Sequence, residues 1–104
     1  MNTTPNTLFK RIRNKKGNPR GVLVAQVIPF HPEQVGIGWS LCSRKDEFDM
    51  QLGKQIAEAR INEADKFLKK VPQSIKVDFA KFATRCSHYF KGQTVIGAGK
   101  FVSA

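Results

Sequence analysis

Three stretches near the N-terminus have the apolar and polar pattern of β-strands. In residues 7–14, Leu8 and Ile12 share one face while polar or aromatic side chains alternate onto the other, which is the period of a half-buried strand. Residues 21–28 are almost continuously apolar and rich in β-branched side chains, which favours a strand covered on both faces. Between these strands, residues 15–19 contain Gly, Asn and Pro and are predicted to form a hairpin turn with a basic tip.

A third strand is predicted at residues 35–42, after a loop around Pro29 and Pro32. A strand face of small side chains lets another backbone approach closely. We therefore expect a helix of the same chain to pack on the small face, with close approach of a ligand as the alternative. The two faces of this strand carry large and small side chains respectively: Val35, Ile37, Trp39 and Leu41 against Gly36, Gly38, Ser40 and Cys42.

A long helix is predicted over residues 43–70. Ser43 and Asp46 stand three positions apart and resemble a capping box, and the acidic first turn and lysine-rich last turn suit the helix dipole. Apolar residues that recur at spacings of three, four or their multiples define the stripe that we expect to face the core: Phe48, Leu52, Ile56, Ala59 and Phe67.

A second helix is predicted after Pro72, with Ser74 as its N-cap and Gly92 at its end. In the tail, residues 93–104, the segments TVIG and KFVS predict one or two short strands at the sheet edge. The face of the second helix that we expect to be buried holds Ile75, Phe79, Phe82, Cys86, Tyr89 and Phe90. Its opposite face holds a row of cationic or titratable side chains, namely Lys81, Arg85 and His88, flanked by Lys76 and Lys91.

Together these elements predict an α+β fold, in which a three-stranded antiparallel meander over residues 7–42 is followed by two helices and a short C-terminal strand. The length and the eight Phe residues fit a single domain, residues 1–104, with a real core. No apolar run approaches the ~18–20 residues that span a bilayer, and the N-terminus lacks the apolar stretch of a secretory signal. We therefore expect a cytoplasmic protein without a membrane partner, in which Cys42 and Cys86 are reduced.

The charge of the chain indicates what kind of partner the protein binds. Lys and Arg outnumber Asp and Glu by 18 to 8, which gives a formal net charge of +10. The positive charge is concentrated towards the two ends of the chain, since residues 1–20 contain no acidic residue and residues 66–104 contain a single one, Asp78. Self-repulsion of this kind disfavours the compact state unless phosphates or an acidic surface neutralise it. The sequence therefore predicts an anionic partner.

Residues that commonly carry catalysis or bind metals are few and poorly spaced. The only soft or imidazole ligands are His31, Cys42, Cys86 and His88, and they form none of the local arrangements of a zinc site. A Cys–His nucleophile pair drawn from the same residues stays a minor alternative, because such pairs form in space. Residues 38–42 resemble a nucleophile elbow only superficially, since Cys replaces the final Gly. We expect no catalytic residue, no metal and no cofactor.

Basic residues interleaved with aromatics are the remaining signal. Lys and Arg neutralise phosphates with release of counterions, and an exposed aromatic ring can stack on an unpaired base. Phe9 and Trp39 are each either core or interface residues, and the sequence leaves both alternatives open. The predicted nucleic-acid contacts are bases on the hairpin and on the second helix: Arg11, Arg13, Lys15, Lys16, Arg20, Lys81, Arg85 and Lys91.

The central part of the chain carries a more specific pattern. RGVLVA at residues 20–25 is followed by VGIGWSLC at residues 35–42 and by KDxFDxxxGxxIAxxR at residues 45–60. These roughly 40 residues resemble a group of small uncharacterised bacteriophage proteins. The resemblance implies expression inside an infected bacterium, but it implies no activity and no functional residue.

The function that the sequence favours is non-catalytic binding of nucleic acid, DNA or RNA, mainly through phosphate contacts, which position a protein without reading sequence. The alternative is a protein-interaction module or inhibitor that docks on an acidic surface of a host protein or nucleoprotein complex, with an exposed aromatic as its anchor. Strandedness of the nucleic acid and the oligomeric state of the protein are left open.

Overall fold

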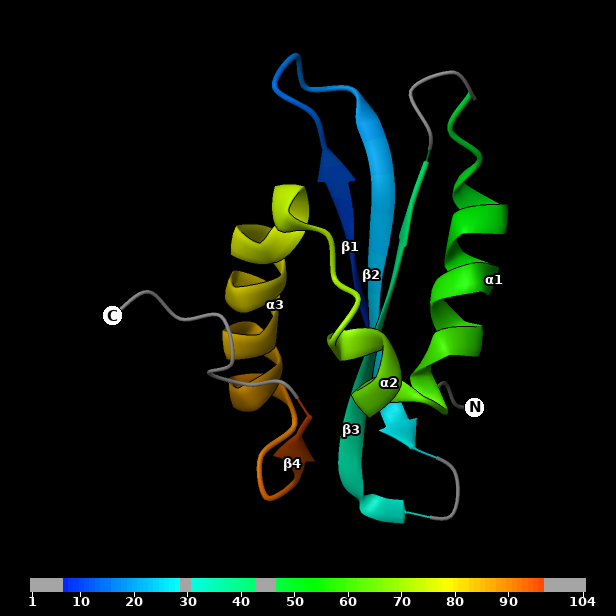
Figure 1. The fold of residues 1–104 in the computed structure, drawn as a ribbon. Coiled ribbons are helices and arrows are strands. Elements are labelled where there is room, and N and C mark those ends of the chain that lie inside the picture. The colour runs from blue at the N-terminus through cyan, green and yellow to red at the C-terminus, as the bar shows by residue number, and fades with distance from the viewer. Residues whose placement is uncertain (1–6, 29–30, 43–46, 97–104) are drawn as a thin grey trace, which may run out of the picture.

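The computed structural model describes residues 7–28, 31–42 and 47–96. These residues form a mixed four-stranded sheet in the order β1-β2-β3-β4. Helix α1 covers one face of the sheet and helix α3 covers the other, while the short helix α2 lies between them in the chain (Figure 1). The predicted α+β class is confirmed, and the sheet has four strands because the tail adds one at the edge.

The antiparallel meander is confirmed. Strand β1 (Thr7–Arg13) pairs with β2 (Pro19–Ile28), and β2 pairs with β3 (His31–Leu41). Strand β3 begins at His31, four residues before the predicted start, and the register of β2 with β3 shifts between Val27 and Ile28. Proline is tolerated in a strand at an edge or an irregularity, which is how Pro32 enters an element that we predicted to begin after it.

The tail returns to the outer edge of β3. Strand β4 (Thr94–Val95) runs parallel to β3 and pairs with Gln34 and Val35. Just after β4, the backbone N–H of Ile96 donates a 2.8 Å hydrogen bond to the carbonyl of Val35. One predicted tail strand is therefore confirmed, and the second, KFVS, lies outside the described residues.

The predicted long helix is wrong in its bounds. The structure has α1 (Met50–Ile61) and a separate five-residue helix α2 (Ala64–Leu68). The N-cap of α1 is Asp49, whose side chain accepts a hydrogen bond of 3.1 Å from the backbone N–H of Leu52. The predicted capping box of residues 43 and 46 lies outside the described residues, but it does not start α1, because residues 47–49 are not helical.

The predicted core-facing stripe is wrong at Leu52, Ile56 and Ala59, which are exposed, although Phe48 packs against buried apolar residues as predicted. Leu52 is 53% exposed and Ile56 is 36% exposed, while the buried residues of α1 are Ala57 and Ile61. The small face of β3 explains the difference, because a Cβ added at Gly38 would overlap the backbone carbonyl oxygen of Ala57. The helix therefore lies close to the sheet at Ala57 and Ile61, which face the glycines of β3, while Leu52 and Ile56 turn aside. The prediction that a helix of the same chain covers the small face is confirmed.

The second helix is confirmed in extent and in most of its buried face. A 3-10 turn, η1 (Gln73–Ile75), leads into α3 (Lys76–Tyr89), which ends shortly before Gly92. Two details differ from the prediction. Ser74 makes no capping hydrogen bond, since Ile75 is the N-cap of α3, and Tyr89 is 48% exposed with its ring edge-on to Phe90.

Two apolar clusters fill the two sides of the sheet. The larger lies under α3 and includes Phe79 and Phe82, and the smaller lies under α1 and includes Val22 and Val24. Strand β2 contributes to both, as its continuous apolar pattern predicted. No helix within the described ranges is both long and apolar enough to cross a membrane.

Candidate functional site

The turn between β1 and β2 is held by its own hydrogen bonds. The side-chain oxygen of Asn14 accepts bonds from the backbone N–H groups of Lys16 and Asn18, at 2.9 and 3.0 Å. Gly17 has a φ of 88°, a conformation that favours glycine, and its N–H bonds to the carbonyl of Asn14. Lys15 and Lys16 therefore project from a turn of defined shape.

Two arginines flank this turn. The guanidinium of Arg13 donates a 2.8 Å hydrogen bond to the carbonyl of Gly17. In the pairing of β1 with β2, Ile12 lies opposite Gly21 and the next residue, Arg13, lies opposite Pro19. Arg20 has no partner in this register and is therefore the extra residue of a β-bulge. Arg20 is half-buried, and its carbonyl accepts a bond of 2.7 Å from the N–H of Cys42. The bulge therefore keeps the main chain of Arg20 in the sheet at the place where the hairpin tip begins.

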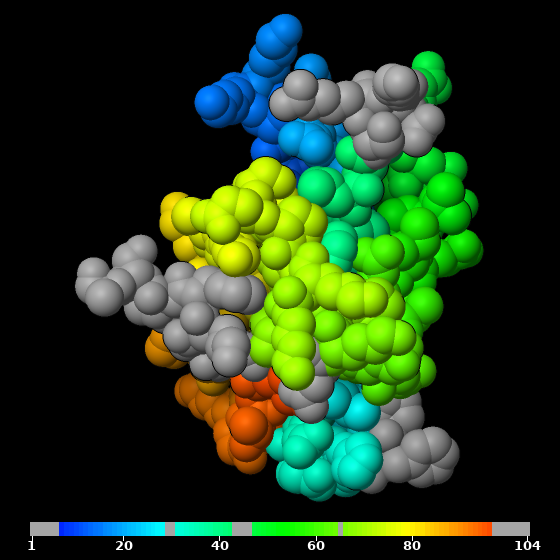
Figure 2. Space-filling model, viewed as in Figure 1, coloured from blue at the N-terminus to red at the C-terminus, as the bar shows by residue number. Residues whose placement is uncertain are grey.

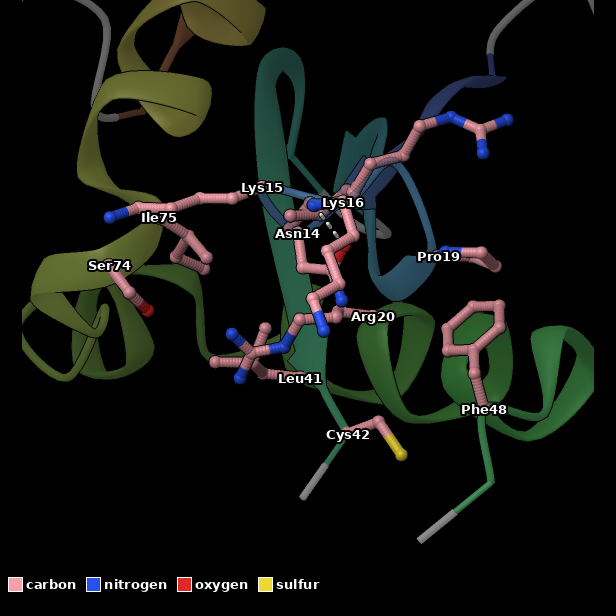
Figure 3. Close-up of a pocket in the computed structure, with 12 residues that line it drawn as sticks. Asn14, Lys15, Lys16, Pro19, Arg20, Leu41, Cys42, Phe48, Ser74 and Ile75 are labelled. Carbon is pink, nitrogen blue, oxygen red and sulfur yellow. Dashed lines mark hydrogen bonds between the residues drawn. The ribbon is translucent and has the colours of Figure 1, made fainter. Parts of the chain in front are cut away.

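These four bases line one hollow of about 710 Å³, which we call the basic hollow (Figure 3). Its apolar walls include Leu41 at the end of β3 and Phe48 before α1, and Ser74 and Ile75 of η1 also line it. Lys15 extends towards the side of Ser74 and Ile75 in Figure 3. None of the described residues that line the hollow is acidic. The members of the hollow that carry charge are Arg13, Lys15, Lys16 and Arg20.

The helices add to the positive potential at this end of the molecule. Both α1 and α3 begin at the end where the hairpin tip lies (Figure 1). A helix N-terminus carries a partial positive charge of about half an elementary charge. Carboxylates of Asp49 at the N-cap of α1 and Asp78 in the first turn of α3 offset part of it. The hairpin itself stands out at the same end, where an extended ligand can reach it (Figure 2).

The structure brings four of the eight predicted bases together and leaves four outside the hollow. Arg11 is exposed on β1, two residues from Arg13. Lys81 and Arg85 are exposed on the outer side of α3, and Lys91 is exposed just beyond its end. The hairpin set and the α3 set are therefore separate surfaces, and only the first is associated with a hollow.

The two aromatics that the sequence left open are now assigned. Trp39 is 8% exposed, and its indole N–H donates a 3.0 Å hydrogen bond to the carbonyl of Phe67, so it belongs to the core. Phe9 is 45% exposed, and the ammonium of Lys54 lies 5.3 Å from its ring centroid. Sequence reasoning missed Lys54 because it belongs to the acidic middle of the chain, and only the position of α1 brings it to β1.

Arg60 is a second residue that sequence reasoning missed. Its guanidinium donates a 2.9 Å hydrogen bond to the carbonyl of Trp39, and its central carbon lies 4.4 Å from the Trp39 ring centroid and 5.0 Å from that of Phe67. Burial lowers the pKa of this guanidinium. These contacts fix α1 and α2 to the edge of β3, so Arg60 is structural and is not available as a phosphate contact.

Of the residues that could supply a nucleophile or a metal ligand, Cys86 is buried and His31 is exposed. Burial raises the pKa of the Cys86 thiol to about 12, and nearby Arg85 only partly opposes this. The thiol therefore stays protonated and is a poor nucleophile. His31 is exposed beside Glu33, at 3.7 Å, and within the described residues no three His, Cys, Asp or Glu side chains gather as a metal site would require.

A comparison of the chain with protein-family models, with curated proteins and with solved structures finds no match. The assignment of function therefore depends on the chemistry of the surface described above.

Proposed function

We propose that the protein binds nucleic acid without catalysis, mainly through phosphate contacts made at the basic hollow. The observation that carries the proposal is the convergence of Arg13, Lys15, Lys16 and Arg20 on one hollow whose described lining contains no carboxylate. Arginine and lysine there would replace condensed counterions on the phosphates, and the release of those ions drives binding. The resemblance of the central segment to phage proteins supports a setting in the cytoplasm of an infected bacterium.

The shape of the site supports a polyanion over a small anion. A hollow of about 710 Å³ is larger than a single phosphate needs, and its charges come from the rim of a projecting hairpin. Such contacts position a nucleic acid without reading base edges. We therefore expect little preference for sequence.

The test is charge reversal at the hairpin tip, Lys15→Glu with Lys16→Glu. Both side chains are exposed, so the double variant should keep its free energy of unfolding within about 0.5 kcal/mol of the wild type. Affinity for a mixed-sequence oligonucleotide, measured by fluorescence anisotropy at low salt, should fall at least tenfold, because two attractive contacts become repulsive.

The matched control is Lys81→Glu with Arg85→Glu on α3. It changes the net charge by the same amount, and both side chains are exposed and lie outside the hollow. A smaller loss for this variant identifies the hollow as the binding site. Equal losses for the two variants would extend the contact surface to α3, and an unchanged affinity of the hairpin variant at low salt would remove the hollow from the site.

A protein-interaction module is the second candidate, and Phe9 is the observation that favours it. An exposed ring flanked by Arg11 and Lys54 could anchor a partner with an acidic surface, since interface energy concentrates in buried aromatics. For such a module, the hairpin charges would mainly steer association. The hairpin variant would then lose association rate with the partner, and most of that loss would vanish near physiological salt.

A further inference from the structure

We propose that the nucleic acid bound at the basic hollow is single-stranded and that Phe9 stacks on one of its bases. This inference rests on the proposed function and goes further, because it assigns a second surface and the class of ligand. The surface consists of Phe9 and Arg11 on β1 with Lys54 on α1, and we call it the open strand face.

The register of the sheet places these residues on one side. Phe9 pairs with Val24, and Arg11 pairs with Val22. Val22 and Val24 belong to the apolar cluster under α1, so Phe9 and Arg11 lie on the same face of the sheet as that helix. Helix α1 packs over β2 and β3, and no helix or strand of the described residues covers the face of β1 beside it. Phe9 is consequently 45% exposed although it stands in a strand.

The open strand face leads into the basic hollow. Phe9, Arg11 and Arg13 follow one another at every second residue of β1, so each is about 7 Å from the next along the strand. Arg13 lines the hollow. An extended strand of nucleic acid whose phosphates contact Arg13 and the lysines of the turn therefore passes Arg11 and reaches Phe9.

The chemistry of this face selects unpaired bases. An aromatic ring offers a flat apolar surface on which any base can stack. The faces of the bases in a duplex are already stacked on one another, so only an unpaired base is free to stack on the ring. The ammonium of Lys54 lies over the Phe9 ring, 5.3 Å from its centroid, so a base that stacks on that face would displace it towards the neighbouring phosphate. At the far end of the face, Glu58 accepts a 3.2 Å hydrogen bond from Gln26, and its carboxylate limits how far the polyanion extends.

The test compares strandedness in the wild type and in Phe9→Leu. The probe is a short fluorescein-labelled oligonucleotide of mixed sequence, made as DNA and as RNA, each alone and annealed to its complement. Leucine keeps an apolar side chain and removes the ring. We expect single-strand affinity to fall roughly tenfold in Phe9→Leu, as loss of one stacked base implies, while the affinity for duplex stays within about twofold.

Tyr89→Leu is the matched control, because Tyr89 is equally exposed, at 48%, but belongs to α3. It should leave both affinities unchanged. Phe9→Trp should keep single-strand affinity, and the fluorescence of the new indole should be quenched when the single strand binds. A side chain with a purely structural role would not give that quenching.

The outcomes separate the two proposals. Equal binding of single strand and duplex, with no effect of Phe9→Leu, would overturn the stacking inference and leave phosphate binding at the hollow intact. An equal loss for both forms in Phe9→Leu would likewise overturn stacking. If no oligonucleotide binds the wild type at low salt, the proposed function itself is wrong, and Phe9 becomes the anchor to test in a protein-interaction module.

Discussion

At the scale of single residues, Gly38 determines how closely α1 lies on the sheet. A Cβ at this position would overlap the carbonyl oxygen of Ala57 and would lie 2.7 Å from its carbonyl carbon. Both atoms belong to the helix backbone, so no side-chain rotation relieves the contact. A substitution therefore has to move the whole helix.

We predict that Gly38→Ala destabilises the protein by about 3 kcal/mol, at the upper end of the usual cost of overpacking. Gly36→Ala is the graded comparison, because its Cβ would approach Ile61 and Ala64 at 3.0 to 3.2 Å, a contact that a small shift can relieve. Denaturant unfolding of both variants measures the difference. A Gly38→Ala protein as stable as wild type would contradict the packing of α1 described here.

At the scale of elements, local patterns predicted the strands better than the helices. The meander followed from alternation in β1 and from the apolar run of β2, which are signals contained in each segment. The stripe of α1 failed because size and apolar character indicated Leu52 and Ile56, whereas the small-residue surface that receives the helix contacts Ala57 and Ile61. That surface belongs to β3, so the spacing of apolar residues within the helix cannot predict which of them face it.

The candidate site shows the same division. The bases of the hairpin were predictable because they are contiguous in the sequence and surround a recognisable turn. The far wall of the hollow was not, since Ser74 and Ile75 reach it only after the chain has crossed the edge of β3. Likewise, Lys54 reaches Phe9 only through the placement of α1.

The start of α1 gives a prediction at this scale. Asp49 satisfies the N–H of Leu52 as N-cap, so Asp49→Ala should lower the free energy of unfolding by about 1 kcal/mol. Asp49→Ser should restore most of this loss, because its hydroxyl can accept the same bond. Thermal melts of the three proteins measure the effect. Identical melts for wild type and Asp49→Ala would show that the helix starts elsewhere.

At the scale of the whole molecule, a net charge of +10 has to be carried without a matching set of acids. The fold places the hairpin bases and the start of both helices at one end, so positive potential is concentrated there (Figure 1). The bases of α3 lie on a different surface and raise the general attraction for polyanions. We therefore predict one local binding site on a protein whose overall positive charge attracts polyanions.

The dependence of affinity on salt tests this account most directly. With contacts from Arg11, Arg13, Lys15, Lys16 and Arg20, a single strand should give a log–log slope of about −3.5, which is a loss of roughly 100-fold between about 50 and about 200 mM salt. The measurement is an anisotropy titration of a mixed-sequence oligonucleotide at several salt concentrations. A steep linear slope that becomes shallower by about 1.4 in the double variant Lys15→Glu, Lys16→Glu is the expected result. A flat salt dependence would contradict phosphate binding at the basic hollow.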